Sequence, residues 1–392
     1  MPAGQWKLAA ALAVLLQAGC SPSREIEAVS VLGDIAAGAG ASRLKKTTEP
    51  AVRETIRYTF EGVANAADVY RPGGSARAEA VTILVPGVVR LGKDDPRIVA
   101  FAQTLARARF LVFVPDLVNL RHLSVSSKDA AALSRVARYA AARTGVGTQG
   151  SVGMIAFSYA AGPALLAAMA EETRHSVRFV YTVGSYYSIE AVITYLTTGH
   201  FRTGSGQPWS RSAPSPYAVW VLTRSFASWL DDPADRRGLN AIADARLADP
   251  DADISDALAR LGADGRAVYE LLDNTDPESV ARLVAGLPEP VLSELRALDL
   301  SRRGLTDLKA RLVVIHGRDD RLIPYTESVA LAAALERDRG RLFIVGSLKH
   351  VELRLSGVAD GFRLWRAVRT LLEERDRMPP PSWNGKTQAV PE

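Results

Sequence analysis

A serine directly follows a short apolar segment, 152–157, which is typical of a buried strand. Ser158 is followed in turn by an Ala-rich segment with helical character, 160–172. A strand, a sharp turn with a serine at its apex and then a helix form the layout of a nucleophile elbow. Such a turn is strained and requires small residues two positions before and after the serine. Both are alanine here, Ala156 and Ala160, where glycine is usual, so this motif alone is a weak signal.

An acid and a base follow two later apolar strands. Asp320 lies in the segment 316–324, His-Gly-Arg-Asp-Asp-Arg-Leu-Ile-Pro, which comes directly after a predicted strand. His350 follows the next predicted strand in the same way. Reacting groups gather at the carboxyl ends of strands in open α/β sheets, so Ser158, Asp320 and His350 are expected to converge.

Acyl transfer is the chemistry that these three side chains can perform together. Ser158 is expected to be the nucleophile, which needs a base to take its proton. His350 is expected to be that base, and later the acid that protonates the leaving group. Asp320 is expected to hold the imidazole in the right tautomer and to stabilise its charged form.

Backbone N–H groups are expected to stabilise the oxyanion. One is that of Tyr159, the residue after the serine. The other is expected in the loop after the strand predicted at 81–85, around Gly87 and Val88.

The order serine, aspartate, histidine resembles that of the α/β-hydrolase superfamily. The resemblance extends over about residues 56–374, and the pattern Gly317-x-x-Asp320-x-x-Ile323-Pro324 is quite specific to that superfamily. It implies a mostly parallel central sheet with helices on both faces. The sequence departs from the family at the two elbow alanines, and at Pro-Gly before Val88, where the family often has His-Gly.

Each candidate has a competing interpretation. Serine is a common helix N-cap, and Ser158 precedes a helical segment. Asp319 competes with Asp320, although the spacing to the following Ile-Pro favours Asp320, and Asp116 also ends a strand. Three other histidines compete with His350: His316, expected at a strand end with a satisfied hydrogen bond, and His122 and His200, expected in loops. His175 is expected to be a surface residue.

Strands alternate with helices in two parts of the chain, 51–187 and 306–376. This alternation indicates an α/β fold with a parallel sheet covered on both faces. The segment between them, 188–305, is mostly helical and carries 12 Arg and no Lys against 17 Asp and Glu, a net charge of −5. The whole chain carries +5, so the remainder carries +10. This acidic insertion is expected to be a cap over the active site, or a structural insertion without a role in binding.

The segment 1–20 is typical of a signal peptide. Lys7 precedes an apolar run that is too short to span a bilayer. The run ends in Gln17-Ala-Gly-Cys20, which resembles a bacterial lipobox except at Gln17, where an aliphatic residue is usual. Cys20 is the only cysteine of the chain, which excludes an intramolecular disulfide and favours lipidation over an ordinary signal peptide. We therefore expect an exported lipoprotein of the cell envelope that faces the periplasm, with 21–50 as a tether and 377–392 as a loose tail.

Composition and motifs argue against several other classes of protein. Hydrophobic residues make up 47% of the chain, as in a globular protein. The positive charge is not concentrated in a Lys/Arg cluster, which argues against a nucleic-acid partner. There is no His-x-x-x-His pair, no cysteine cluster and no Gly-x-Gly-x-x-Gly after a strand, so no metal or cofactor is expected.

Together these features predict an envelope serine hydrolase that cleaves a carboxylic ester through an acyl-enzyme. The triad does not select the substrate, because amidases, thioesterases, peptidases and acyltransferases use the same residues. A non-catalytic binding or scaffold protein on the same fold is the alternative from a different class. The elbow alanines point toward it, and the intact triad argues against it. The size of the acyl group, the leaving group and the oligomeric state stay open.

Overall fold

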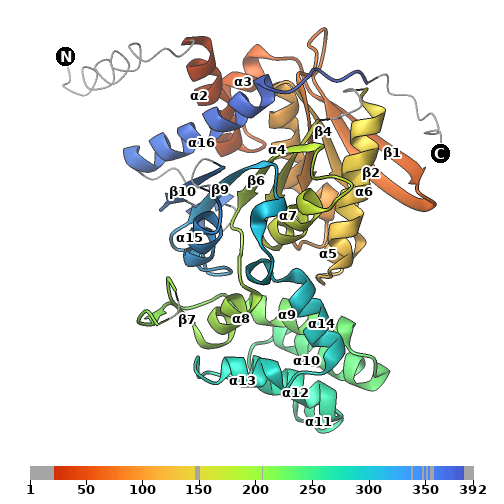
Figure 1. Cartoon of the computed structure of the whole chain (residues 1–392), viewed down its shortest axis with the longest axis vertical. Coiled ribbons are helices and arrows are strands. Elements are labelled where there is room, and N and C mark those ends of the chain that lie inside the picture. The colour runs from red at the N-terminus through yellow and green to blue at the C-terminus, as the bar shows by residue number, and fades with distance from the viewer. Residues whose placement is uncertain are drawn as a thin grey trace.

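The central element of the fold is an eight-stranded sheet with the strand order β1-β2-β4-β3-β5-β6-β9-β10 (Figure 1). The computed structural model describes residues 22–145, 151–204, 206–336, 339–346, 348–349, 352–353 and 357–383. The strands from β4 to β10 in this order run parallel, and β1 and β2 add an antiparallel hairpin at one edge. The strands of this sheet are Val52–Phe60 (β1), Val63–Arg71 (β2), Ala80–Val85 (β3), Phe110–Pro115 (β4), Val152–Phe157 (β5), Val177–Val183 (β6), Arg311–Gly317 (β9) and Gly340–Val345 (β10).

Both faces of the sheet are covered, because nearly every side chain of its inner strands is buried and most of these side chains are apolar. In β3, for example, Val81 and Ile83 belong to one hydrophobic cluster, whereas Ala80 and Leu84 belong to another on the opposite face. Strands that are buried on both sides are typical of parallel sheets covered by helices. The predicted α/β class with a mostly parallel sheet is therefore confirmed.

Two groups of helices cover these faces. One face is covered by α6 and α7 together with α15, and the other by α4 and α16. Asp95 caps α4 by accepting a hydrogen bond from the N–H of Arg97, and Pro96 occupies the first turn, where a missing N–H costs nothing. The helices of this core are Pro96–Arg107 (α4), Val118–Arg121 (α5), Lys128–Arg143 (α6), Ala161–Met169 (α7), Tyr325–Ala333 (α15) and Val358–Asp376 (α16).

The N-terminal residues form helices where a loose tether was expected. Pro22–Ala37 (α2) packs along α16 and against α4, and the short helix Arg43–Thr47 (α3) follows it. Ala28 and Val31 of α2 are fully buried. With Leu32 and Ile35 they make a stripe at helical spacing, and burial of this stripe is the physical reason for the difference. The predicted signal segment 1–20, with Cys20, lies outside the described residues.

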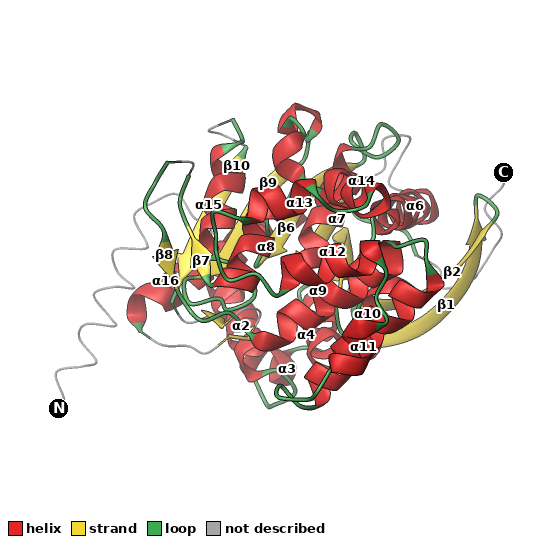
Figure 2. Ribbon diagram, turned by 90° about the horizontal axis from the view of Figure 1, so that it is seen from below, coloured by secondary structure: helices red, strands yellow, loops and turns green. Residues whose placement is uncertain are grey.

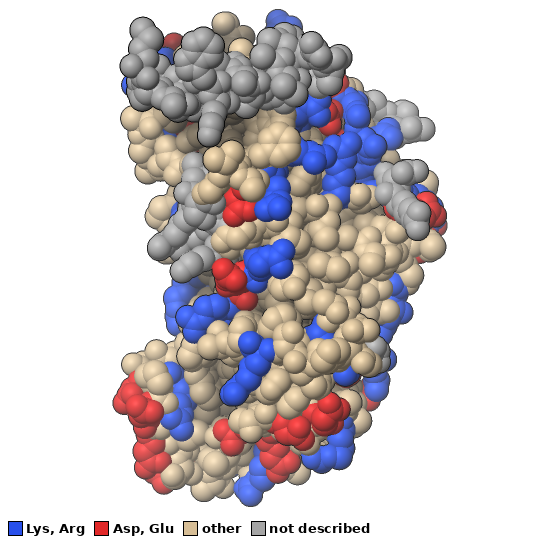
Figure 3. Space-filling view, turned by 90° about the vertical axis from the view of Figure 1, so that its left-hand side faces the viewer, with Lys and Arg blue, Asp and Glu red and all other residues tan. Residues whose placement is uncertain are grey.

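A helical insertion leaves the core after β6 and returns before β9. Figure 1 shows it in green to cyan below the sheet, and in Figure 2 its helices lie in front of the strands. On the face drawn in Figure 3, most Asp and Glu side chains gather at the lower end, which this insertion forms. Its elements are Ile189–Thr198 (α8), His200–Phe201 (β7), Ser210–Arg211 (β8), Pro216–Trp229 (α9), Pro233–Ala248 (α10), Ser255–Ala259 (α11), Ala263–Leu272 (α12), Val280–Ala285 (α13) and Glu289–Leu298 (α14).

The chain after α16 also differs from the expected loose tail over its described part, 377–383. The Ser382 N–H donates to the Thr144 carbonyl at 2.9 Å, and the Trp383 ring meets the Phe113 ring edge-on at 5.3 Å between centroids. This packing onto the end of α6 and onto β4 orders the segment. Among the described residues, no helix has the length and apolar character that crossing a membrane requires.

Candidate active site

Ser158 occupies the strained turn that the sequence predicts. It follows β5 directly and has φ of +57°, a left-handed conformation that residues other than glycine adopt rarely. A single turn of 3-10 helix, Ser158–Ala160, then leads into α7. Ala156 and Ala160 are both fully buried, so a larger side chain at either position would have no room. Backbone strain of this kind is concentrated at functional sites.

The helix after the serine is packed closely by Tyr186. A Cβ added at Gly162 would lie 1.9 Å from the hydroxyl oxygen of Tyr186, so only glycine fits there. The Tyr186 hydroxyl donates to the Leu298 carbonyl at 3.0 Å, and its ring stacks on that of Tyr159 with 5.9 Å between centroids. The ring of Tyr159, the residue after the serine, is therefore packed against Tyr186, which is itself hydrogen-bonded to the insertion.

Asp320 is held in one orientation beyond the end of β9. One carboxylate oxygen accepts hydrogen bonds from the N–H groups of Leu322 at 2.8 Å and Ile323 at 3.1 Å. Asp320 is buried, whereas Asp319 is exposed. A fixed, buried carboxylate is what orientation of an imidazole requires, so the geometry favours Asp320 of the two.

His316 is buried beside this carboxylate and is engaged on both ring nitrogens. Its Nδ1 lies 2.6 Å from the Ser328 hydroxyl, and its Nε2 lies 2.9 Å from the Ile323 carbonyl and 3.3 Å from the second Asp320 oxygen. The expected strand-end histidine with a satisfied hydrogen bond is confirmed. Because both nitrogens have partners and the ring is fully buried, His316 is not available as the base for Ser158.

The remaining histidines divide into three that lie elsewhere and one outside the described residues. His122, His175 and His200 do not line the cavity at Ser158. His350 lies outside the described part of the chain, so its place in the triad stays a prediction. Leu348, two positions earlier in the sequence, does line that cavity. Asp116, the other carboxylate at a strand end, forms an ion pair with Arg121 at 2.7 Å.

The predicted oxyanion residues lie next to the serine. A Cβ added at Gly87 would lie 3.6 Å from the Ser158 Cβ, and Gly87, Val88 and Tyr159 line one cavity with Ser158. Gly87 follows β3, and Ser158 follows the adjacent parallel strand β5, which explains this proximity. The arrangement places two backbone segments where an oxyanion could be bound.

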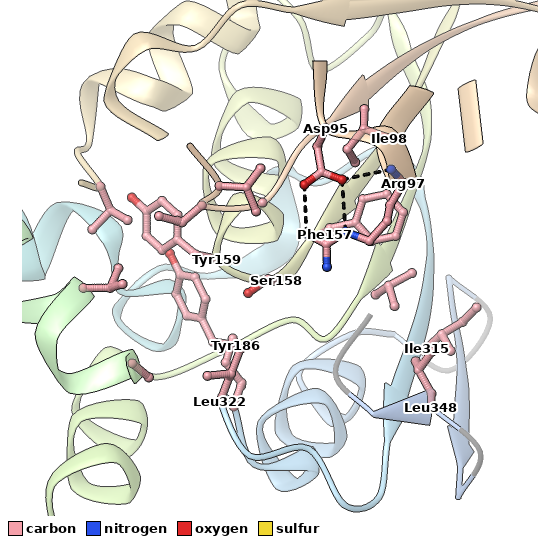
Figure 4. A pocket seen from close by; sticks show the side chains of 18 of the residues that line it. Asp95, Arg97, Ile98, Phe157, Ser158, Tyr159, Tyr186, Ile315, Leu322 and Leu348 are labelled. Carbon is pink, nitrogen blue, oxygen red and sulfur yellow. Dashed lines mark hydrogen bonds and ion pairs between the residues drawn. The ribbon is translucent and has the colours of Figure 1, made fainter. Parts of the chain in front are cut away.

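Ser158 opens into a cavity of about 710 Å³, within the roughly 300–1,000 Å³ of typical small-molecule sites (Figure 4). The core, the insertion and α2 all contribute to its wall. The contribution of α2, through Leu32, Asp34 and Ile35, and of Gly38 directly after it, is not part of the site predicted from the sequence. The helical spacing of the apolar residues in 28–35 is the signal that could have revealed it. No group of three or more potential metal ligands occurs among the described residues.

Comparison with known proteins shows the fold. No family model and no curated protein matches the sequence. Among solved structures, the chain is similar to the rice cell wall degrading esterase LipA from Xanthomonas oryzae, with 12% identity, a TM-score of 0.51 and coverage of 88% of this chain and 94% of that chain. A ligand-bound form of LipA gives 14% identity, a TM-score of 0.50 and the same coverage. The strand order, the serine turn and this likeness together establish that the chain has the α/β-hydrolase fold.

Proposed function

We propose that this protein is a serine hydrolase that cleaves carboxylic esters with the triad Ser158, Asp320 and His350. The observation that carries the proposal is the left-handed backbone at Ser158, at the end of β5 and in the wall of a large cavity. The buried Asp320, fixed at the end of a strand of the same sheet, supports it. The fold shared with an esterase is in line with it.

The mechanism follows from the chemistry of the three side chains. His350 takes the proton of Ser158 as the hydroxyl oxygen attacks the ester carbonyl. Backbone N–H groups of Tyr159 and of the Gly87–Val88 loop stabilise the negative oxygen of the tetrahedral intermediate. The protonated histidine then gives its proton to the leaving alcohol, and a water molecule activated by the same histidine releases the acid. Asp320 holds the imidazole throughout and stabilises its charge.

The insertion is proposed as the cap of this site. Its helices α8, α9 and α14 contribute Ile193, Val221 and Leu298 to the cavity wall.

Elimination among the described histidines also supports His350 as the base, since the buried His316 has partners on both nitrogens.

Labelling with a fluorophosphonate probe tests the nucleophile and the base. The wild type should label, whereas Ser158→Ala and His350→Ala should lose labelling together with hydrolysis of p-nitrophenyl esters, by about 10⁴-fold or more. Ser225→Ala is the matched serine control, because Ser225 also lines the cavity. His122→Ala is the histidine control, because His122 is exposed. A folded wild type that neither labels nor hydrolyses any ester would refute the enzyme and favour the binding or scaffold protein.

The location is a separate proposal. We infer an envelope lipoprotein anchored through Cys20 and facing the periplasm, because the lone cysteine ends an apolar N-terminal run two residues before α2 begins at Pro22. Labelled palmitate should be incorporated into the wild type and not into Cys20→Ser. Equal incorporation into both proteins would exclude this anchor.

A further inference from the structure

The cavity has two parts, one on each side of Ser158. In Figure 4, Asp95, Ile98 and Phe157 lie on one side of the serine, and Tyr159 and Tyr186 lie on the other. The α2 lobe is the part bounded by Leu32 and Ile35 of α2, Ile98 and Phe101 of α4, and Leu364 and Val368 of α16. The insertion lobe is the part bounded by Ile193 of α8, Val221 and Leu222 of α9, and Leu298 of α14.

Charged groups in the α2 lobe are paired with other protein groups. Asp34, which is fully buried, accepts hydrogen bonds from the Lys45 ammonium and the Thr104 hydroxyl, both at 2.6 Å. Asp95 binds the Arg97 guanidinium at 2.9 and 3.0 Å. A polar ligand group placed beside these two carboxylates would lose its hydration and find both of them already paired, which is costly. The lobe therefore suits an aliphatic chain.

The α2 wall is a fixed part of the fold. Arg375 of α16 is only 1% exposed, and it donates to Glu27 of α2 at 3.0 Å and to the Ala108 carbonyl at 2.9 Å. Arg369 of α16 binds Glu25 of α2 at 2.8 Å. These contacts set the distance between α2 and α16, and hence the width of the lobe between them.

We propose that the α2 lobe is the subsite for the acyl chain of a long-chain aliphatic ester. The inference rests on the proposed function and deepens it by naming the substrate class. The acyl part stays bonded to Ser158 while the alcohol leaves, so it needs a pocket directly beside the serine. The paired charges and the apolar walls on α2, α4 and α16 provide such a pocket.

Two alanines provide a matched test, because each lies half-buried on a helix that lines the cavity. Ala100 is on α4 in the α2 lobe, and Ala218 is on α9 in the insertion lobe. Wild-type kcat/KM should rise along the p-nitrophenyl series from acetate to palmitate, by up to about fourfold per buried methylene. Ala100→Phe should lower kcat/KM for palmitate at least about tenfold and leave acetate within about twofold, whereas Ala218→Phe should leave the chain-length profile unchanged. Ile35→Trp fills the same lobe from α2 and should act like Ala100→Phe.

A measurement of ligand binding distinguishes two cases: a wrongly assigned subsite, and a protein that binds the chain but is not an enzyme. In the Ser158→Ala background, cis-parinaric acid, a fatty acid that fluoresces in apolar surroundings, should bind. Its affinity should fall about tenfold with Ala100→Phe and not with Ala218→Phe. Loss of long-chain turnover or of binding with Ala218→Phe alone would overturn the subsite, and so would a wild-type preference for acetate. Binding that depends on Ala100 in a wild type that hydrolyses no ester would refute the enzyme and retain the subsite.

Discussion

The two walls of the cavity are attached to the core by different kinds of contact. The α2 wall is attached by ion pairs, such as Glu27 with Arg375 and Glu25 with Arg369, in addition to its buried apolar stripe. The insertion wall is attached by hydrogen bonds to the loop that precedes α6. There the Trp229 Nε1 donates to the Val125 carbonyl at 2.9 Å, and Glu294 accepts from the Ser127 N–H at 2.7 Å.

The difference extends to the buried carboxylates that support each wall. Burial opposes ionisation of Asp34 in the α2 wall, but hydrogen bonds from Lys45, Ser42 and Thr104 outweigh it and hold its pKa below the usual value. Burial raises the pKa of Glu327 to about 7, although it accepts hydrogen bonds from the N–H groups where the insertion begins. Falling pH is therefore expected to destabilise the α2 wall, because Asp34 becomes protonated. Rising pH up to about 7 is expected to destabilise the insertion wall, because Glu327 becomes ionised.

The largest effect is expected from a charge placed beneath α2. Val31 is fully buried, and Val31→Asp would put an unpaired carboxylate against α4 and α16, which should cost about 3–5 kcal/mol of unfolding free energy. Val29 on the same helix is 60% exposed, so Val29→Asp should stay within about 0.5 kcal/mol of wild type. Urea unfolding measures both. An equal loss of unfolding free energy in Val31→Asp and Val29→Asp would show that α2 does not pack as described.

A smaller effect is expected from Glu327 at the start of the insertion. The folded protein keeps the Glu327 proton up to about pH 7, whereas the unfolded chain loses it near 4.5, so this group makes stability fall as pH rises between those values. The change amounts to about 3 kcal/mol at most. Glu327→Gln stays neutral and retains an acceptor for Tyr187 and Ser188. Its stability relative to wild type should therefore rise from pH 4.5 to 7.5 in urea unfolding, and a constant difference would contradict the assignment.

The smallest effect is expected where the insertion meets the loop before α6. Glu294→Ala removes the acceptor of the Ser127 N–H and hydroxyl groups and should cost about 1–2 kcal/mol. Glu289 lies on the same helix in an exposed pair with Arg296, so Glu289→Ala is the control. Hydrogen exchange of the α14 amides should accelerate in the first variant only. Acceleration in α2 instead would mean that the two walls are coupled.

Local patterns indicate much of the candidate site. Ser158 can be proposed because the strand, serine and helix are contiguous in sequence, and Asp320 because its spacing to a following Ile-Pro is short; their catalytic roles stay predictions. Alanine in place of glycine left the serine turn intact, as the φ of +57° at Ser158 confirms. The strand pattern also predicted the parallel sheet, since its inner strands are short and mostly apolar runs that alternate with helices.

The α2 wall was missed because its partners are remote in sequence. Glu25 and Glu27 bind arginines more than 340 positions away, so the apolar spacing in 28–35 could have indicated a buried helix but not its partners. Composition rich in Gly, Ala and Ser pointed instead to a tether. The same reason explains why the two lobes were not foreseen, since a cavity depends on how several elements pack together.

The contact between α2 and α16, the first and last of the described helices, also determines when the site is completed during synthesis. Arg375 lies near the end of α16, and α2 pairs with it across almost the whole described chain. A nascent chain can form β1 to β6 early, and α2 can then pack against α4, but the ion pairs of α2 with α16 form only after α16 has been made. The cavity therefore stays open on one side in a chain that lacks α16. The α2 lobe is assembled only once α16 has been made, so substrate binding there depends on helices from both ends of the described chain.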